Sequence, residues 1–401
     1  MLVRFLGFGT VWLMVISVLV LNFNKLGLVV NNYVSIGGVE LYLHDFSFLF
    51  SFFLIIIKLR SLKYDKIFYF IALILIFSAV KIFCVQNTVS VEFLRRYLTL
   101  QSGMVLLYAW YVFFREKYLH RFGCILIVFT ILNMVQYLLH VFSGGYESHP
   151  FGGLVYFIIS IPIFYSFHVV LTRGNYFYFF PLVSSLVVCF LEGHRSGIVA
   201  LVISFCLYFV LSKRLLKGGL LAGVVVLVAL GYVVFGPSDY VVDMIDRYET
   251  TFDTKQKNYV GRLDAYSNTW ATIGERGIWG KDISDELYSL KKAKKREGIT
   301  VRTIYYYEII PHNYLLEMLF YYGYIGFIFS LFIVLDQIRL ILVSVKNRGR
   351  EDFAVVILTS AMVFNLVFSM FNVSGTTQYL SFTFLLPYVS LRAYYSELLE
   401  K

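Results

Sequence analysis

Apolar stretches about as long as a membrane is thick recur along almost the whole chain, and they constrain its fold more than any other feature. A helix that crosses the hydrocarbon core needs roughly 20 mostly apolar residues. Hydrophobic residues make up 59% of the 401 residues and charged residues 15%, whereas a soluble domain carries charge on about a quarter of its residues. The sequence therefore predicts an all-α polytopic membrane protein.

The apolar stretches predict about twelve transmembrane helices. Their expected ranges are 4–21, 40–57, 67–85, 97–114, 122–142, 153–171, 176–191, 197–212, 218–235, 313–335, 353–371 and 379–396. The segment 22–39 is too short and too polar to span, so a re-entrant or surface loop is expected there. These ranges divide the chain into 1–235 with the first nine helices, a large polar loop or cap at 236–311, and 312–401 with the last three.

Basic residues gather in alternate connections, and this pattern indicates the orientation. Lys and Arg are frequent in 58–66 and 115–121, whereas 143–152 and 372–378 contain none. Because cytoplasmic loops carry such an excess, we expect both termini in the cytoplasm and the 236–311 segment on the outer side. The net charge of +10 follows from this topology. No nucleic-acid partner is expected from it.

Cysteine and carboxylate spacing favours chemistry without a metal. The four cysteines all fall inside apolar runs, where they act as small buried hydrophobic residues. Their spacing matches neither a zinc site nor a disulfide framework. The outer loops contain no Asp-x-Asp motif. We therefore expect no metal and no cofactor.

Three elements of the outer face carry residues suited to a substrate with a diphosphate. Arg195 lies in a short turn before an expected helix, Arg262 lies in the polar loop, and His312 closes that loop. A guanidinium offers a planar fork of donors that matches phosphate oxygens bidentately. A neutral imidazole can accept a proton from an attacking hydroxyl. The pattern predicts Arg195 and Arg262 as diphosphate ligands and His312 as the catalytic base.

Each of these residues also has a purely structural alternative. Arg195 can extend to the lipid headgroups, Arg262 can form a surface ion pair with Asp264, and His312 can simply begin a helix at the interface. Their expected position on one face of the membrane favours the functional interpretation. Asn365, by contrast, is expected only to form an interhelical hydrogen bond.

Further polar residues are candidates for supporting roles. Glu317 shares a helical face with Asn313, so both could orient the site. Lys81 lies near the outer end of an expected span, where a charge is costly unless it reaches the headgroups or lines a cavity. The other candidates are arginines expected on the outer side: Arg95, Arg96 and Arg247.

The chain resembles the O-antigen polymerase and O-antigen ligase superfamily of bacterial envelope glycosyltransferases. The resemblance covers the whole layout of helices and the large loop. Its most specific part is a His-Asn-x-x-Leu-x-x-x-x-x-x-Gly-x-x-Gly element, which is matched over residues 312–326 with glycines at Gly323 and Gly326. Arg195-Ser196 is similar to the family's Arg turn before a helix, and residues 261–280 are similar to its loop element.

The resemblance implies a GT-C-like glycosyltransferase in the bacterial inner membrane, with its large loop in the periplasm. The implied reaction is a metal-independent, inverting transfer of glycan from undecaprenyl diphosphate. Arg195 and Arg262 would neutralise the diphosphate, and His312 would activate the acceptor hydroxyl. The implied partners are an undecaprenyl-diphosphate-linked oligosaccharide, membrane lipid, a chain-length regulator and a flippase.

Two alternatives stay open. A polymerase adds the glycan to another lipid-linked repeat unit, and a ligase adds it to lipid A–core. The His-Asn-Tyr-Leu-Leu form of the closing element and the Tyr- and Phe-rich composition favour the polymerase. A flippase or other transporter would predict paired repeats and more charge at mid-membrane, which this sequence does not show.

Overall fold

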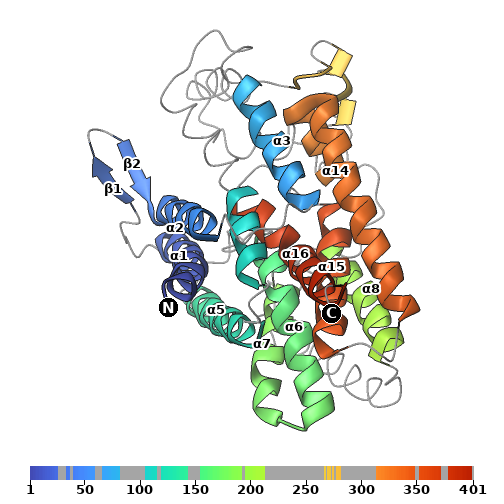
Figure 1. Ribbon diagram of the computed structural model, residues 1–401. Helices are drawn as coiled ribbons and strands as arrows, with labels where there is room; N and C mark the ends of the chain where they lie inside the picture. Colours follow the sequence, from blue (N-terminus) through green and yellow to red (C-terminus); the bar gives the residue numbers. More distant parts are fainter. Residues whose placement is uncertain are drawn as a thin grey trace.

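A computed structural model shows a predominantly helical protein (Figure 1). It describes residues 1–25, 33–36, 39–58, 66–81, 104–114, 119–142, 154–191, 195–212, 266–267, 269–271, 273–274, 277–280, 313–347, 352–371 and 378–399. Within these residues, a two-stranded antiparallel hairpin is the exception to the helical architecture.

The described helices lie where apolar runs occur in the sequence. They are α1 (Leu2–Lys25), α2 (Leu43–Lys58), α3 (Lys66–Val80), α5 (Leu119–Phe142), α6 (Leu154–Arg173), α7 (Phe179–Leu191), α8 (Arg195–Ser212), α14 (Tyr314–Lys346), α15 (Phe353–Ser369) and α16 (Gln378–Leu399), with a 3₁₀ turn, η3 (Tyr176–Tyr178). Residues 104–114 are helical as well. Every expected span overlaps a helix except 218–235, which lies outside the described residues.

One helical stretch in the described part of the chain, Tyr322–Lys346, is long and apolar enough to cross a membrane. The same part of the chain contains shorter apolar helical stretches of 10–17 residues, among them Ile159–Arg173 and Phe353–Ser369. The helical architecture is therefore confirmed, while the arrangement of about twelve spans stays a prediction.

The expected loop at 22–39 contains more regular structure than predicted. Helix α1 continues to Lys25, and β1 (Tyr33–Ile36) then pairs with β2 (Val39–Tyr42). The strands contain β-branched and aromatic residues, which fit a pleated surface. The sequence between them is Gly37-Gly38, and a Gly-Gly pair favours a tight hairpin turn. A search for apolar stretches long enough to cross a membrane does not detect so short a hairpin.

Helix α15 forms the centre of the molecule. It packs against α6, α8, α14 and α16, and every residue from Ala354 to Asn365 is buried. A helix that is apolar all round must be enclosed by neighbours or lipid. Side-chain hydrogen bonds join α15 to its neighbours: Asn365 Nδ2 donates to the Phe384 carbonyl of α16 at 3.1 Å, and Thr359 Oγ1 donates to Ser344 Oγ of α14 at 3.1 Å. Trp110 Nε1 donates to Ser390 Oγ of α16 at 2.9 Å. The predicted interhelical role of Asn365 is confirmed.

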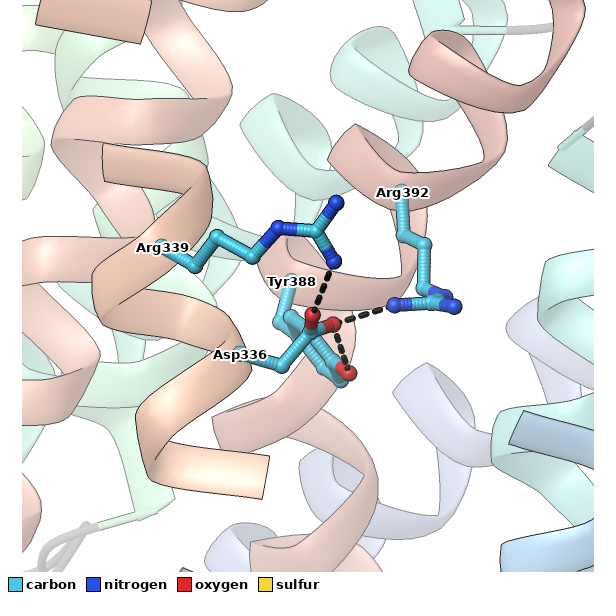
Figure 2. Close-up of polar contacts among 4 residues, drawn as sticks. All are labelled: Asp336, Arg339, Tyr388 and Arg392. Atoms are coloured by element: carbon cyan, nitrogen blue, oxygen red, sulfur yellow. Dashed lines mark hydrogen bonds and ion pairs between the residues drawn. The ribbon is translucent and has the colours of Figure 1, made fainter. Parts of the chain in front are cut away.

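Helix α14 continues well past the expected end of its span at residue 335. It reaches Lys346, and Asp336 and Arg339 lie within it. Asp336 is paired with Arg392 of α16 and accepts a hydrogen bond from the Tyr388 hydroxyl at 2.8 Å (Figure 2). Because the carboxylate has partners on a neighbouring helix, its charge does not end α14. The helix is therefore longer than the membrane span predicted at 313–335, and that span stays a prediction.

Candidate active site

The structure describes some of the predicted site residues and leaves others outside. Residues 95, 96, 247, 262 and 312 lie outside the described residues, so the roles of Arg95, Arg96, Arg247, Arg262 and His312 stay predictions. Arg195 is the first residue of α8, as expected for an Arg turn that precedes a helix. Lys81, Asn313 and Glu317 are described with their side chains.

Asn313 begins α14 and ties it to α15. Its Oδ1 accepts the backbone N–H groups of Leu315 at 3.0 Å and Leu316 at 3.2 Å, which makes it the N-cap of the helix. Its Nδ2 donates to the carbonyl of Met370, at the end of α15, at 3.1 Å. All the polar contacts described for this side chain are therefore structural. They fix the backbone position directly after residue 312.

Glu317 lies one turn further along α14 and is completely buried. Its backbone N–H donates to the Asn313 carbonyl at 2.8 Å, so the two residues lie on one helical face, as the spacing predicted. A carboxylate is rarely buried without a specific role, because removal from water strongly disfavours the charged form. The sequence shows an acidic residue at this position, and only the tertiary structure shows that it is completely buried.

Helix α14 bends sharply at Gly323. This residue has φ +62° and ψ −157°, which divides the helix into a nine-residue beginning and a long continuation. At the bend, the backbone N–H of Tyr324 donates to the carbonyl of Gly277 at 2.9 Å. We name the beginning, residues 314–322, the half-helix, and the contact between residues 277–280 and Gly323–Tyr324 the joint. The joint brings together two elements of the family resemblance that are far apart in sequence.

Helix α3 completes this region. The ring of Phe77 stacks on Trp279 with centroids 5.3 Å apart and planes 7° from parallel. Lys81, directly after α3, is 2% exposed, and its Nζ lies 5.9 Å from the centroid of the Tyr322 ring, a cation–π geometry. The expectation that Lys81 could extend to the headgroups is not supported, because its side chain is buried within the protein.

The arrangement therefore joins α3, the 277–280 turn and the bend of α14. Figure 1 shows the yellow segments of 266–280 beside α14. A buried cation, Lys81, and a buried carboxylate, Glu317, belong to this region. Sequence analysis did not identify Phe77, Tyr322 or Tyr324 as part of it, because aromatic residues are frequent throughout this chain and only the fold distinguishes these three.

Metal ligands are not clustered in the described part of the chain. No group of three or more His, Cys, Asp or Glu side chains there could hold a metal ion. The described charged side chains of the region are Lys81 and Glu317. The buried ammonium of Lys81 can interact electrostatically with an anionic group.

Comparison with known protein families gives a match over part of the chain. The family model described as O-antigen ligase matches residues 180–331. This range contains the start of α8 with Arg195, the 277–280 turn, the half-helix and Gly323. Comparison with curated proteins and with solved structures gave no match.

Proposed function

We propose that this chain is a polymerase of surface polysaccharide. The premise is that it belongs, through residues 180–331, to the O-antigen polymerase and ligase superfamily. Members of this superfamily are membrane enzymes that act on lipid-linked oligosaccharides. The proposed donor is an undecaprenyl-diphosphate-linked oligosaccharide, and the proposed acceptor is the terminal sugar hydroxyl of a second lipid-linked repeat unit.

The proposed reaction is a single displacement. The acceptor oxygen attacks the anomeric carbon of the donor, and the bond from that carbon to the diphosphate oxygen breaks with inversion. His312 takes the proton of the acceptor hydroxyl. Undecaprenyl diphosphate leaves with the bonding electron pair, and Arg195 and Arg262 neutralise the charge that develops on it. The reaction needs no metal ion and no cofactor.

The joint is the observation that best supports this assignment. Gly277 follows Arg262 in the loop element, and Gly323 follows His312 in the closing element; the Tyr324 N–H to Gly277 carbonyl contact holds the two elements together. A catalytic base and a diphosphate ligand must lie close to one substrate, and a site built on fixed elements favours that proximity. Lys81 and Glu317 are proposed to support the site electrostatically.

The proposed setting is the bacterial inner membrane. About twelve helices would span it, with both termini in the cytoplasm and residues 236–311 as a periplasmic cap over the site. A chain-length regulator and a flippase are proposed as partners, because a polymerase needs translocated repeat units and a stopping point.

The deciding experiment compares acceptors. Purified protein in nanodiscs would receive the undecaprenyl-diphosphate-linked oligosaccharide alone, or together with lipid A–core. A polymerase extends the oligosaccharide into a ladder without lipid A–core. Product that forms only when lipid A–core is present would identify a ligase instead. A parallel assay in sealed proteoliposomes tests the flippase alternative, which movement of the donor across the bilayer without any new glycosidic bond would favour.

A further inference from the structure

The joint has a glycine on each of its two sides, and these glycines suggest a role in positioning. This inference rests on the proposed function. We infer that Gly277 and Gly323 are positioning residues for the transfer reaction. They set the direction of the half-helix and, through it, the place of His312 relative to the loop element that carries Arg262. Neither glycine needs to touch the substrate for this role.

Gly323 cannot be replaced by any residue with a side chain without a change in the joint. Its φ of +62° is a conformation that L residues rarely adopt. A Cβ placed on it would lie against the carbonyl oxygen of Ile278 and 2.5 Å from that of Gly277. Both obstacles are backbone atoms, and the Gly277 carbonyl is the acceptor for Tyr324. The turn could withdraw only by giving up that hydrogen bond.

Gly277 meets a different kind of obstacle. A Cβ on this residue would lie 2.7 Å from Cε2 of the Tyr324 ring and 3.2 Å from the Ile273 carbonyl oxygen. The nearest atom belongs to a side chain that is 48% exposed. The ring can therefore be removed by substitution, while the backbone hydrogen bond of Tyr324 does not depend on its side chain.

The half-helix is held by contacts at both of its ends. At its start, Asn313 is bound to the Met370 carbonyl, and the Tyr314 ring packs on Phe384 with centroids 4.7 Å apart. The joint lies at the other end of the half-helix. It is connected to α3 because the Trp279 ring stacks on Phe77. A shift of the turn therefore pivots the half-helix about its anchored start, and this changes the direction in which the chain leaves Asn313 toward His312. A misplacement of roughly 1 Å can lower the rate by about 10²-fold.

The test uses substitutions of glycine by alanine that differ in one respect at a time. Gly323→Ala introduces both strain and collision, and Gly277→Ala introduces collision with a removable ring. Gly174→Ala is the control for strain, because Gly174 has φ +62° with nothing within 4 Å of its Cβ position. Gly274→Ala is the control for the loop, because it also has open space and lacks a positive φ.

The measurement is kcat and KM for purified full-length protein with a lipid-diphosphate-linked oligosaccharide, at equal amounts of folded protein determined by size exclusion. We expect Gly323→Ala to lower kcat by about 10²-fold with little change in KM for the donor. Gly277→Ala should lower kcat by a smaller factor, because the half-exposed Tyr324 ring can partly turn aside. Adding Tyr324→Ala should restore kcat in Gly277→Ala but not in Gly323→Ala. Gly174→Ala and Gly274→Ala should retain the wild-type kcat.

A joint that only stabilises the fold would reduce the yield of folded protein and leave its kcat unchanged, which would overturn the inference. Failure of Tyr324→Ala to restore Gly277→Ala would overturn it as well, and this pair decides the question if Gly323→Ala does not fold. His312→Ala in the same assay separates the two proposals. Full turnover of His312→Ala contradicts the proposed base, whereas an inactive His312→Ala beside fully active glycine variants contradicts only the positioning role.

Discussion

The carboxylate of Asp336 on α14 is paired with the guanidinium of Arg392 on α16, and the two side chains are only 20% and 15% exposed. The Tyr388 hydroxyl donates a hydrogen bond to the same carboxylate oxygen at 2.8 Å. On its other oxygen, Asp336 lies 3.5 Å from Arg339, whose side chain is 69% exposed (Figure 2). The cluster joins two helices that are distant in sequence, and its two arginines differ sharply in burial.

This difference predicts unequal effects on stability. Arg392→Gln leaves a largely buried carboxylate without its main cationic partner. Loss of one partner costs about 3–5 kcal/mol in a fully buried pair, and partial exposure reduces the expected loss here to about 1–3 kcal/mol. Arg339→Gln should cost about 0–1 kcal/mol, as for an exposed pair. Thermal unfolding in nanodiscs measures both, and equal losses would show that burial does not govern this cluster.

Asn313 both caps α14 and donates a hydrogen bond to the end of α15, and two substitutions affect these contributions differently. Asn313→Asp keeps the oxygen that accepts from Leu315 and Leu316 but loses the N–H donor to the Met370 carbonyl. Asn313→Ala loses both, and loss of the cap alone costs about 0.5–2 kcal/mol. We therefore expect Asn313→Ala to be less stable than Asn313→Asp in thermal unfolding. The reverse order would show that a carboxylate facing the Met370 carbonyl costs more stability than the cap contributes.

Lys81 provides a test of its proposed supporting role. The ammonium is buried beside Tyr322, where it would strengthen binding of an anionic donor. A hydrogen bond to a charged group contributes about 1.5–3 kcal/mol, so Lys81→Met should weaken donor affinity by roughly 10- to 100-fold. Lys58→Met, at the end of α2, is the control. Unchanged donor affinity in folded Lys81→Met would assign this residue to the fold alone.

The proposed diphosphate ligands, Arg195 and Arg262, should not tolerate replacement by lysine. Arg195→Lys and Arg262→Lys keep the charge but lose the bidentate fork that matches phosphate oxygens. We expect both variants to lose most of the polysaccharide ladder in complemented deletion strains at matched protein levels. Full-length ladders from both would show that these arginines only anchor the protein in the membrane.

His312 predicts the pH dependence of the reaction. The proposed base must be neutral, so activity should fall as pH decreases through the ordinary pKa of imidazole, about 6.5. His312→Ala should lose about 10²–10⁴-fold in turnover, the typical contribution of a general base, and the wild type should stay active with a chelator present. A pH–rate profile of purified protein checks the first point. Inactivation by the chelator would contradict the metal-independent mechanism.

The sequence by itself determined where most helices lie. Apolar runs such as those of α1 and α15 must be buried in lipid or protein, and a helix satisfies their backbone hydrogen bonds locally. This reasoning needs no knowledge of neighbours. It also predicted an interhelical contact for Asn365, because a polar group within an apolar helix needs a specific partner. A helix start near residue 313 followed from the apolar run that begins there.

The tertiary structure alone decided which distant residues meet. Nothing in local composition connects Gly277 with Tyr324, Phe77 with Trp279, or Asp336 with Arg392. These contacts depend on how helices pack and where α14 bends, and packing is a property of pairs of surfaces rather than of one segment. For the same reason, the sequence identified Gly323 only as part of the closing element, while its positive φ and its contact with the loop backbone followed only from the fold.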